Sequence, residues 1–189
     1  MTSVRFIRIN EMTTIDKILI ALDRSSDDMS VFDSAVSLAQ TTGASLMLLH
    51  IISEEDPDYP LLPTYVYYSA LNDSDGGILQ QTFAEYEQSG IDFLRNLTKK
   101  AIAAGINTEY VQLNGIPGWE ICQLASTWSA DLIVVGSRGL KGLKEMFLGS
   151  VSNYVSHHAP CSVLIVRTPT ESVSDREQEA DTKREIATD

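Results

Sequence analysis

Short apolar runs alternate with longer stretches of helical periodicity along this chain, and this alternation restricts the fold more than any other feature. Continuous apolar runs of this length are typical of strands that are covered on both faces. Strands that alternate with helices favour right-handed crossovers between parallel strands. We therefore predict an α/β fold with a five-stranded, doubly wound parallel sheet of order 3-2-1-4-5 and helices on both faces. The predicted strands are residues 17–21, 45–52, 107–113, 132–136 and 162–166.

The segments between these strands have apolar residues at intervals of three and four, the spacing of a helix with one buried face. The pattern predicts a helix over residues 31–42, a long helix through Leu79 to Ala101, and a third helix that ends near Trp128. A last short helix follows Gly149 and carries apolar residues at Val151 and Val155.

Length and composition indicate one ordinary globular domain. The chain has 189 residues, of which 43% are hydrophobic and 21% charged, far from the composition of a disordered protein. We predict an N-terminal extension over residues 1–14, the folded domain over 15–168, and an acidic, disordered tail over 169–189. No apolar run is long enough to span a membrane and no signal peptide precedes the first strand, so we expect a cytoplasmic protein.

The formal net charge of -12 argues against nucleic acid and anionic membrane surfaces as partners. Any bound phosphate must therefore be held by local geometry. The two cysteines, Cys122 and Cys161, have no ligand or disulfide spacing, and we interpret them as reduced, buried thiols. No phosphate loop of the GxxxxGK[ST] type, GxSxG elbow or HExxH metal motif is present.

The segment from residue 53 to 77 contains three prolines and four tyrosines and is too long for an ordinary connection. Two interpretations stay open: a lid or contact surface, and a surface loop whose tyrosines pack back on the domain. We interpret His50 as a core histidine, His157 and His158 as basic residues at a helix C-terminus, and the two tryptophans as core or interface residues.

The stretch from Gly136 to Ser150 combines spaced glycines with the start of a helix. It has the form Gly136-x2-Gly139-x9-Gly149-Ser150, directly after a strand and directly before a helix. Glycines let the backbone turn sharply and approach a ligand closely. The N–H groups and the dipole at a helix start attract phosphate. This stretch therefore predicts a phosphate-binding loop.

This motif, together with KILIALDRS at residue 17 and NGIPGWEI at residue 114, resembles the nucleotide-binding members of the universal stress protein family. The likeness runs from about Lys17 to Arg167. It implies an adenine nucleotide as ligand (ATP, ADP or AMP, with Mg²⁺ as a further candidate) and a homodimer formed through the last strand.

The resemblance also implies roles for individual residues. The adenine and ribose would lie against Ala21, Leu22, Asp23, Ile51 and Gly115. The phosphates would be surrounded by Gly136, Arg138, Gly139, Gly149, Ser150, Val151 and Ser152. The strand order predicts the same ligand position. It reverses between the first and fourth strands, and ligands of such sheets bind where the order reverses. Two alternatives stay open: Asp23 as a helix cap or turn residue, and Arg138 as an exposed charge.

Our functional hypothesis is a nucleotide-binding stress-response module that senses rather than consumes ATP. The alternative is a slow ATP hydrolase or phosphate-transfer enzyme that uses the same crevice, and a third is a structural dimer with a vestigial site. No nucleophile and base pair is visible in the sequence, so we assign no catalytic residue and leave enzymatic activity open.

Overall fold

The computed structural model describes residues 14–24, 28–54, 56, 59–60, 76–137 and 148–167. Outside these ranges lie residues 1–13 of the proposed N-terminal extension, the proposed acidic tail, most of the tyrosine-rich segment, and Arg138 and Gly139. Within them, no helix is long and apolar enough to cross a membrane.

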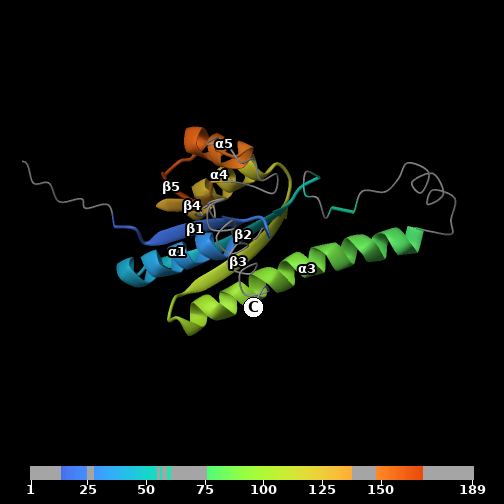
Figure 1. The fold of residues 1–189 in the computed structure, drawn as a ribbon, viewed down its shortest axis with the longest axis horizontal. Helices are drawn as coiled ribbons and strands as arrows, with labels where there is room; N and C mark the ends of the chain where they lie inside the picture. The colour runs from blue at the N-terminus through green and yellow to red at the C-terminus, as the bar shows by residue number, and fades with distance from the viewer. Residues whose placement is uncertain are drawn as a thin grey trace, which may run out of the picture.

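The described chain forms one parallel sheet with helices on both faces (Figure 1). Its strand order is β3-β2-β1-β4-β5, and all four strand pairs are parallel. The predicted fold class and strand order are therefore confirmed. The elements are β1 (Lys17–Leu22), α1 (Asp28–Thr42), β2 (Ser45–Ile52), α3 (Gly76–Ala103), β3 (Thr108–Asn114), α4 (Pro117–Trp128), β4 (Leu132–Gly136), α5 (Ser150–His158) and β5 (Ser162–Val166).

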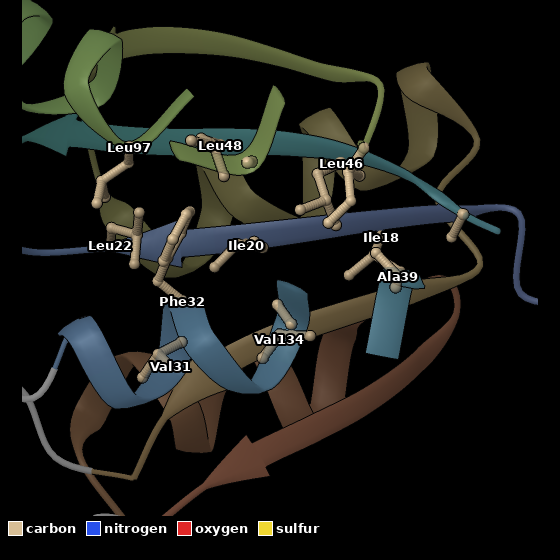
Figure 2. Packing of buried hydrophobic residues seen from close by; sticks show 14 of the residues in the cluster. Ile18, Ile20, Leu22, Val31, Phe32, Ala39, Leu46, Leu48, Leu97 and Val134 are labelled. Carbon is tan, nitrogen blue, oxygen red and sulfur yellow. The ribbon is translucent and has the colours of Figure 1, made fainter. Parts of the chain in front are cut away.

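The alternation of side chains along each strand divides the core into two layers, because successive residues of a strand point to opposite faces. Ile18, Ile20 and Leu22 of β1 face α1 and α3, and Leu19 faces the layer of α4 and α5. Figure 2 shows the first layer, in which Val31 and Phe32 of α1 pack toward β1. The central strands are buried on both faces, which explains their continuous apolar sequence.

The amino edge of the sheet is fixed by the turn before β4. One carboxylate oxygen of Asp131 accepts hydrogen bonds from the backbone N–H groups of Asp16 and Lys17, both at 2.9 Å. The ammonium group of Lys17 donates to the carbonyl oxygen of Trp128 at 3.0 Å and lies over its indole ring. These contacts set the start of β1 beside β4, and so align the opposite ends of the two strands.

The structure confirms some of the predictions for single residues and contradicts others. His50 is 1% exposed and belongs to the core, as predicted. His157 and His158 lie in the last turn of α5, also as predicted. Cys122 and Cys161 are both free, but only Cys122 is fully buried. Trp119 is 48% exposed, so it is no core residue.

Candidate functional site

The reversal of strand order places the ends of β1 and β4 side by side at the carboxyl edge. Backbone pairing runs from Ile18 with Leu132 to Ile20 with Val134. Asp23 follows β1, and Gly136 ends β4. From this edge β1 leads to α1 on one face, and β4 leads to α5 on the other face. A crevice where two neighbouring strands depart to opposite faces is the usual ligand position of such a sheet.

Three hydrogen bonds tie together the two ends of the glycine-rich segment. The N–H of Gly149 donates to the carbonyl oxygen of Ser137 at 3.0 Å. The N–H of Ser137 donates to the carbonyl oxygen of Val166 at 2.8 Å, which attaches this point to the end of β5. The hydroxyl of Ser152 donates to the carbonyl oxygen of Gly136. The segment between Ser137 and Gly149 thus begins and ends at one fixed place.

The first turn of α5 opens at this fixed place. Gly149 is its N-cap with φ -59° and ψ 157°, and among the described residues no side chain caps the helix. Ser150 is exposed, Val151 is half-buried and Ser152 is buried. The first N–H groups of a helix have no partner within the helix and carry the positive end of its dipole. Their position at the sheet edge makes this turn able to hold an anion.

The end of β2 and the turn after β3 form a further part of this edge of the sheet. Ile51 pairs with Leu113 of β3 and packs against the layer of α4 and α5. The N–H of Gly115 donates to the carbonyl oxygen of Ile52 at 3.1 Å, so this turn is bound to the end of β2. Gly115 has φ 150°, and a Cβ there would lie 2.5 Å from Oε1 of Glu120. Both conditions favour glycine at this position.

The structure therefore assembles most of the sequence-predicted residues along one edge of the sheet. Asp23 follows β1, Ile51 and Gly115 lie at the ends of β2 and β3, and Gly136 lies at the end of β4. Ala21 and Leu22 are the last residues of β1, and Gly149 to Ser152 start α5. Arg138 and Gly139 lie outside the described residues, so their roles stay predictions.

Sequence reasoning missed two charged residues beside this edge. The Glu120 carboxylate lies against Gly115, and an acidic residue in the first turn of a helix was a visible signal for it. Arg24 directly follows Asp23, and its guanidinium carbon lies 5.7 Å from the centroid of the Tyr86 ring. No local pattern indicates this contact, because Arg24 and Tyr86 are far apart in sequence.

Charged residues near this edge of the sheet affect the pKa of buried His50. Burial, and secondly the positive charge of Arg24, lower the pKa of His50 below its usual value of 6.5. The side chain of Gln112 and the carboxylates of Asp56 and Asp23 act in the opposite direction without cancelling this effect. His50 is therefore neutral at pH 7. In the described part of the chain, no three His, Cys, Asp or Glu side chains gather into a metal site.

Comparisons with known proteins identify the family to which the chain is related. Residues 14–167 match the model of the universal stress protein family. Universal stress protein Sll1388 of Synechocystis is 38% identical over 80% of this chain and 97% of its own length. Universal stress protein YxiE of Bacillus subtilis is also 38% identical, over 80% of this chain and 99% of its own.

Solved structures give the same result for the fold. Universal stress protein UspA from Lactobacillus plantarum superposes with a TM-score of 0.63 at 26% identity, and covers 81% of this chain and 98% of its own. A universal stress protein in complex with cAMP has a TM-score of 0.54 and 24% identity over 83% of this chain and 100% of that one. With a family model that matches most of its length and two curated relatives at 38% identity, the chain belongs to the universal stress protein family.

Proposed function

We propose that this chain is a cytoplasmic stress-response protein that binds ATP, or a related adenine nucleotide, at the carboxyl edge of β1 and β4. The observation that carries the proposal is the first turn of α5, which opens at a point held by the Gly149 to Ser137 and Ser152 to Gly136 hydrogen bonds. A turn of this kind binds phosphate without bulk positive charge. That matters in a chain whose net charge is -12.

The proposed orientation puts the phosphates at α5 and the base at the opposite end of the crevice. Gly136, Gly149, Ser150, Val151 and Ser152 would surround the phosphates, with Arg138 and Gly139 from the intervening loop. Ala21, Leu22, Asp23, Ile51 and Gly115 would line the adenine and ribose.

Two structural neighbours support an adenine nucleotide as the ligand class. One is a universal stress protein in complex with cAMP. The other, from Archaeoglobus fulgidus, is in complex with dAMP, with a TM-score of 0.51 and 18% identity. Mg²⁺ commonly binds through substrate phosphates and keeps several waters. We therefore propose that any Mg²⁺ arrives with the nucleotide.

The experiment that tests the nucleotide site is calorimetric titration of the full chain with ATP, ADP and AMP. Gly149→Val with Ser150→Ala places side chains where N–H groups would meet phosphate, and should abolish micromolar binding. Thr127→Ala, on the exposed end of α4, is the matched control and should bind as the parent does. Equal affinity in the parent and the double variant would remove the phosphate site from α5.

We also propose that the bound nucleotide is turned over slowly or not at all. Hydrolysis needs a positioned water and stabilisation of the developing phosphate charge. The carboxylate of Asp23 follows β1, at the end of the crevice proposed for the sugar. Single-turnover assays with protein in excess over ATP should give rates far below the typical enzyme value of about 10 per second. A rate near that value, lost in Asp23→Ala while binding persists, would favour a hydrolase instead.

The last part of the proposal is a homodimer through β5, which is an edge strand of the sheet. Its apolar Leu164 is 38% exposed. An edge strand with an exposed apolar side chain is a template for pairing with a second copy. Neighbouring Val163 and Ile165 pack inward against the layer of α4 and α5.

A further inference from the structure

Helix α3 is much longer than the sheet it covers. Its 28 residues span about 42 Å at the usual rise per residue, whereas the eight residues of β2 span about 26 Å. The first half of α3 extends beyond the carboxyl edge of the sheet, as Figure 1 shows. This edge is the one that carries the proposed nucleotide site.

Gly90 marks the point at which α3 leaves the sheet. A Cβ on Gly90 would lie 2.2 Å from Oε1 of Gln112 and 3.1 Å from Nδ1 of His50. His50 and Gln112 are paired across β2 and β3, and His50 is paired with Leu22, the last residue of β1. Residues 76–89, which precede Gly90 and are here called the α3 overhang, therefore continue past the end of β1.

Contacts on Tyr86 hold the α3 overhang to the rest of the molecule. The Tyr86 hydroxyl donates a hydrogen bond to the carboxylate of Asp56, which is only 9% exposed. The Tyr59 ring packs edge-on against Tyr86 at 6.0 Å between centroids, and against Phe83 at 5.7 Å. The guanidinium carbon of Arg24 lies 5.7 Å from the Tyr86 ring centroid. One residue further along, the side-chain amide of Gln112 donates a hydrogen bond to the carbonyl oxygen of Glu87 at 3.0 Å.

Arg24, which contacts Tyr86, is joined by one peptide bond to Asp23 of the proposed nucleotide site. Arg24 has φ 64°, in the left-handed region that non-glycine residues rarely adopt. From this conformation the side chain of Arg24 reaches Tyr86 on α3, and Asp23 lies between Arg24 and the end of β1. The residue that contacts Tyr86 is therefore the direct neighbour of Asp23.

We propose that Arg24 is a positioning residue that couples nucleotide binding at Asp23 to the packing of the α3 overhang. The inference rests on the proposed nucleotide site. Binding that fixes the backbone of Asp23 also fixes Arg24, and so strengthens the contact with Tyr86. Because linkage is reciprocal, loosening Tyr86 must weaken nucleotide binding by the same factor as nucleotide tightens the overhang. The α3 overhang would then report the occupied state on the surface of the protein.

The test measures amide hydrogen exchange in peptides covering residues 76–89 of the full chain, with and without ATP, together with the calorimetric Kd. In the parent, ATP should slow exchange of the overhang. Arg24→Gly should weaken ATP binding about fivefold, at the low end of typical coupling, and abolish the ATP effect on residues 76–89. Arg24→Gly keeps the left-handed backbone accessible and removes the side chain, but it also adds backbone freedom beside Asp23, so Tyr86→Leu serves as the variant that leaves the Arg24 backbone unchanged.

Two variants of Tyr86 separate coupling from simple stability. Tyr86→Leu removes the ring and should behave as Arg24→Gly does. Tyr86→Phe keeps the ring over Arg24 and removes the hydroxyl that bonds to Asp56, so it should retain most of the ATP response. Gln81→Ala, on the exposed face of the same helix, is the control and should respond as the parent does.

The outcomes distinguish this coupling from the proposed function. If ATP binds the parent but leaves exchange at residues 76–89 unchanged, or if Arg24→Gly responds as the parent does, the coupling is wrong and the nucleotide site stands. If no adenine nucleotide binds the parent at all, the proposed function fails and the coupling fails with it. Thermal unfolding of each variant without nucleotide verifies that it is folded.

Discussion

The hydroxyl of Ser152 donates a hydrogen bond to the carbonyl oxygen of Gly136, and so joins the first turn of α5 to the last residue of β4. Ser152 is 5% exposed and Gly136 is half-buried, so this contact is partly buried. It holds the proposed phosphate-binding turn at a fixed distance from the sheet. The role of Ser152 toward a ligand would then fall to its backbone N–H rather than to its hydroxyl.

Ser152→Ala should therefore lower both stability and nucleotide affinity. The half-buried Gly136 carbonyl then loses this hydrogen bond, which costs about 1 kcal/mol of unfolding free energy. Urea denaturation and ATP titration measure the two effects. Ser156→Ala is the matched control, because its hydroxyl bonds to Asn153 on the exposed face of the same helix. A Ser152→Ala protein with parental stability would contradict the structural role.

The neutral state of buried His50 predicts acid sensitivity. Its pKa is lowered below 6.5 in the folded protein by burial and by Arg24, so the unfolded chain binds the proton first. The stabilising contribution is fully present above about pH 6.5. It is lost as the pH falls from there through the lower pKa of the folded state, at up to about 1.4 kcal/mol per pH unit.

Urea denaturation of the parent between pH 7.5 and 5.5 should show this loss of stability. In His50→Gln the dependence should be much flatter over the same range, because the titrating group is gone. Gln123→Asn changes an exposed side chain that does not titrate and should leave the parental slope unchanged. Equal slopes in the parent and His50→Gln would assign the acid sensitivity to other groups.

Sequence patterns predicted the fold well because each strand carries its own local signal. The ranges 45–52, 132–136 and 162–166 agree with β2, β4 and β5. The edge strand β3 begins one residue later than predicted, at Thr108, and ends one later, at Asn114. Its mixed burial gives a weaker pattern than the buried central strands give. Helix α3 starts at Gly76 and so includes the last residues that we assigned to the tyrosine-rich segment.

The candidate site was predictable only where a local motif marks it. The glycine spacing and the strand order together indicated the edge shared by β1 and β4. The contacts of Arg24 with Tyr86, and of Tyr86 with Asp56, link separate elements, and no periodicity or spacing reports them. Of the two alternatives for Trp119, the core was wrong, since the structure leaves this residue 48% exposed at the start of α4, and the interface stays a prediction.

The proposed dimer through β5 predicts that Leu164→Glu gives a monomer. Leu164 is 38% exposed, so the change should leave the fold intact while it puts charge on the pairing strand. Light scattering at micromolar concentration measures the molecular mass. Ile102→Glu is the matched control, because Ile102 is 56% exposed on α3, and it should stay dimeric. A monomeric parent, or a Leu164→Glu protein that remains a dimer, would contradict this interface.

Gly90→Ala tests how closely α3 approaches the sheet, since two effects of opposite sign compete there. Alanine gains about 1 kcal/mol over glycine inside a helix. The new Cβ, however, would lie 2.2 Å from Oε1 of Gln112. Gln112 cannot move away freely, because its amide nitrogen bonds to the carbonyl oxygen of Glu87.

If Gln112 stays in place, overpacking costs about 1–3 kcal/mol; if it moves aside, the lost hydrogen bond to Glu87 costs about 1 kcal/mol instead. Either cost offsets the gain of about 1 kcal/mol, so Gly90→Ala should leave the unfolding free energy of the parent unchanged or lower it. In a Gln112→Ala background the obstructing side chain is absent, and the same change should be neutral or stabilising. Urea denaturation of the four proteins gives the coupling energy between the two positions. If Gly90→Ala stabilises the parent as much as it stabilises Gln112→Ala, then α3 does not approach β3 as closely as the structure indicates.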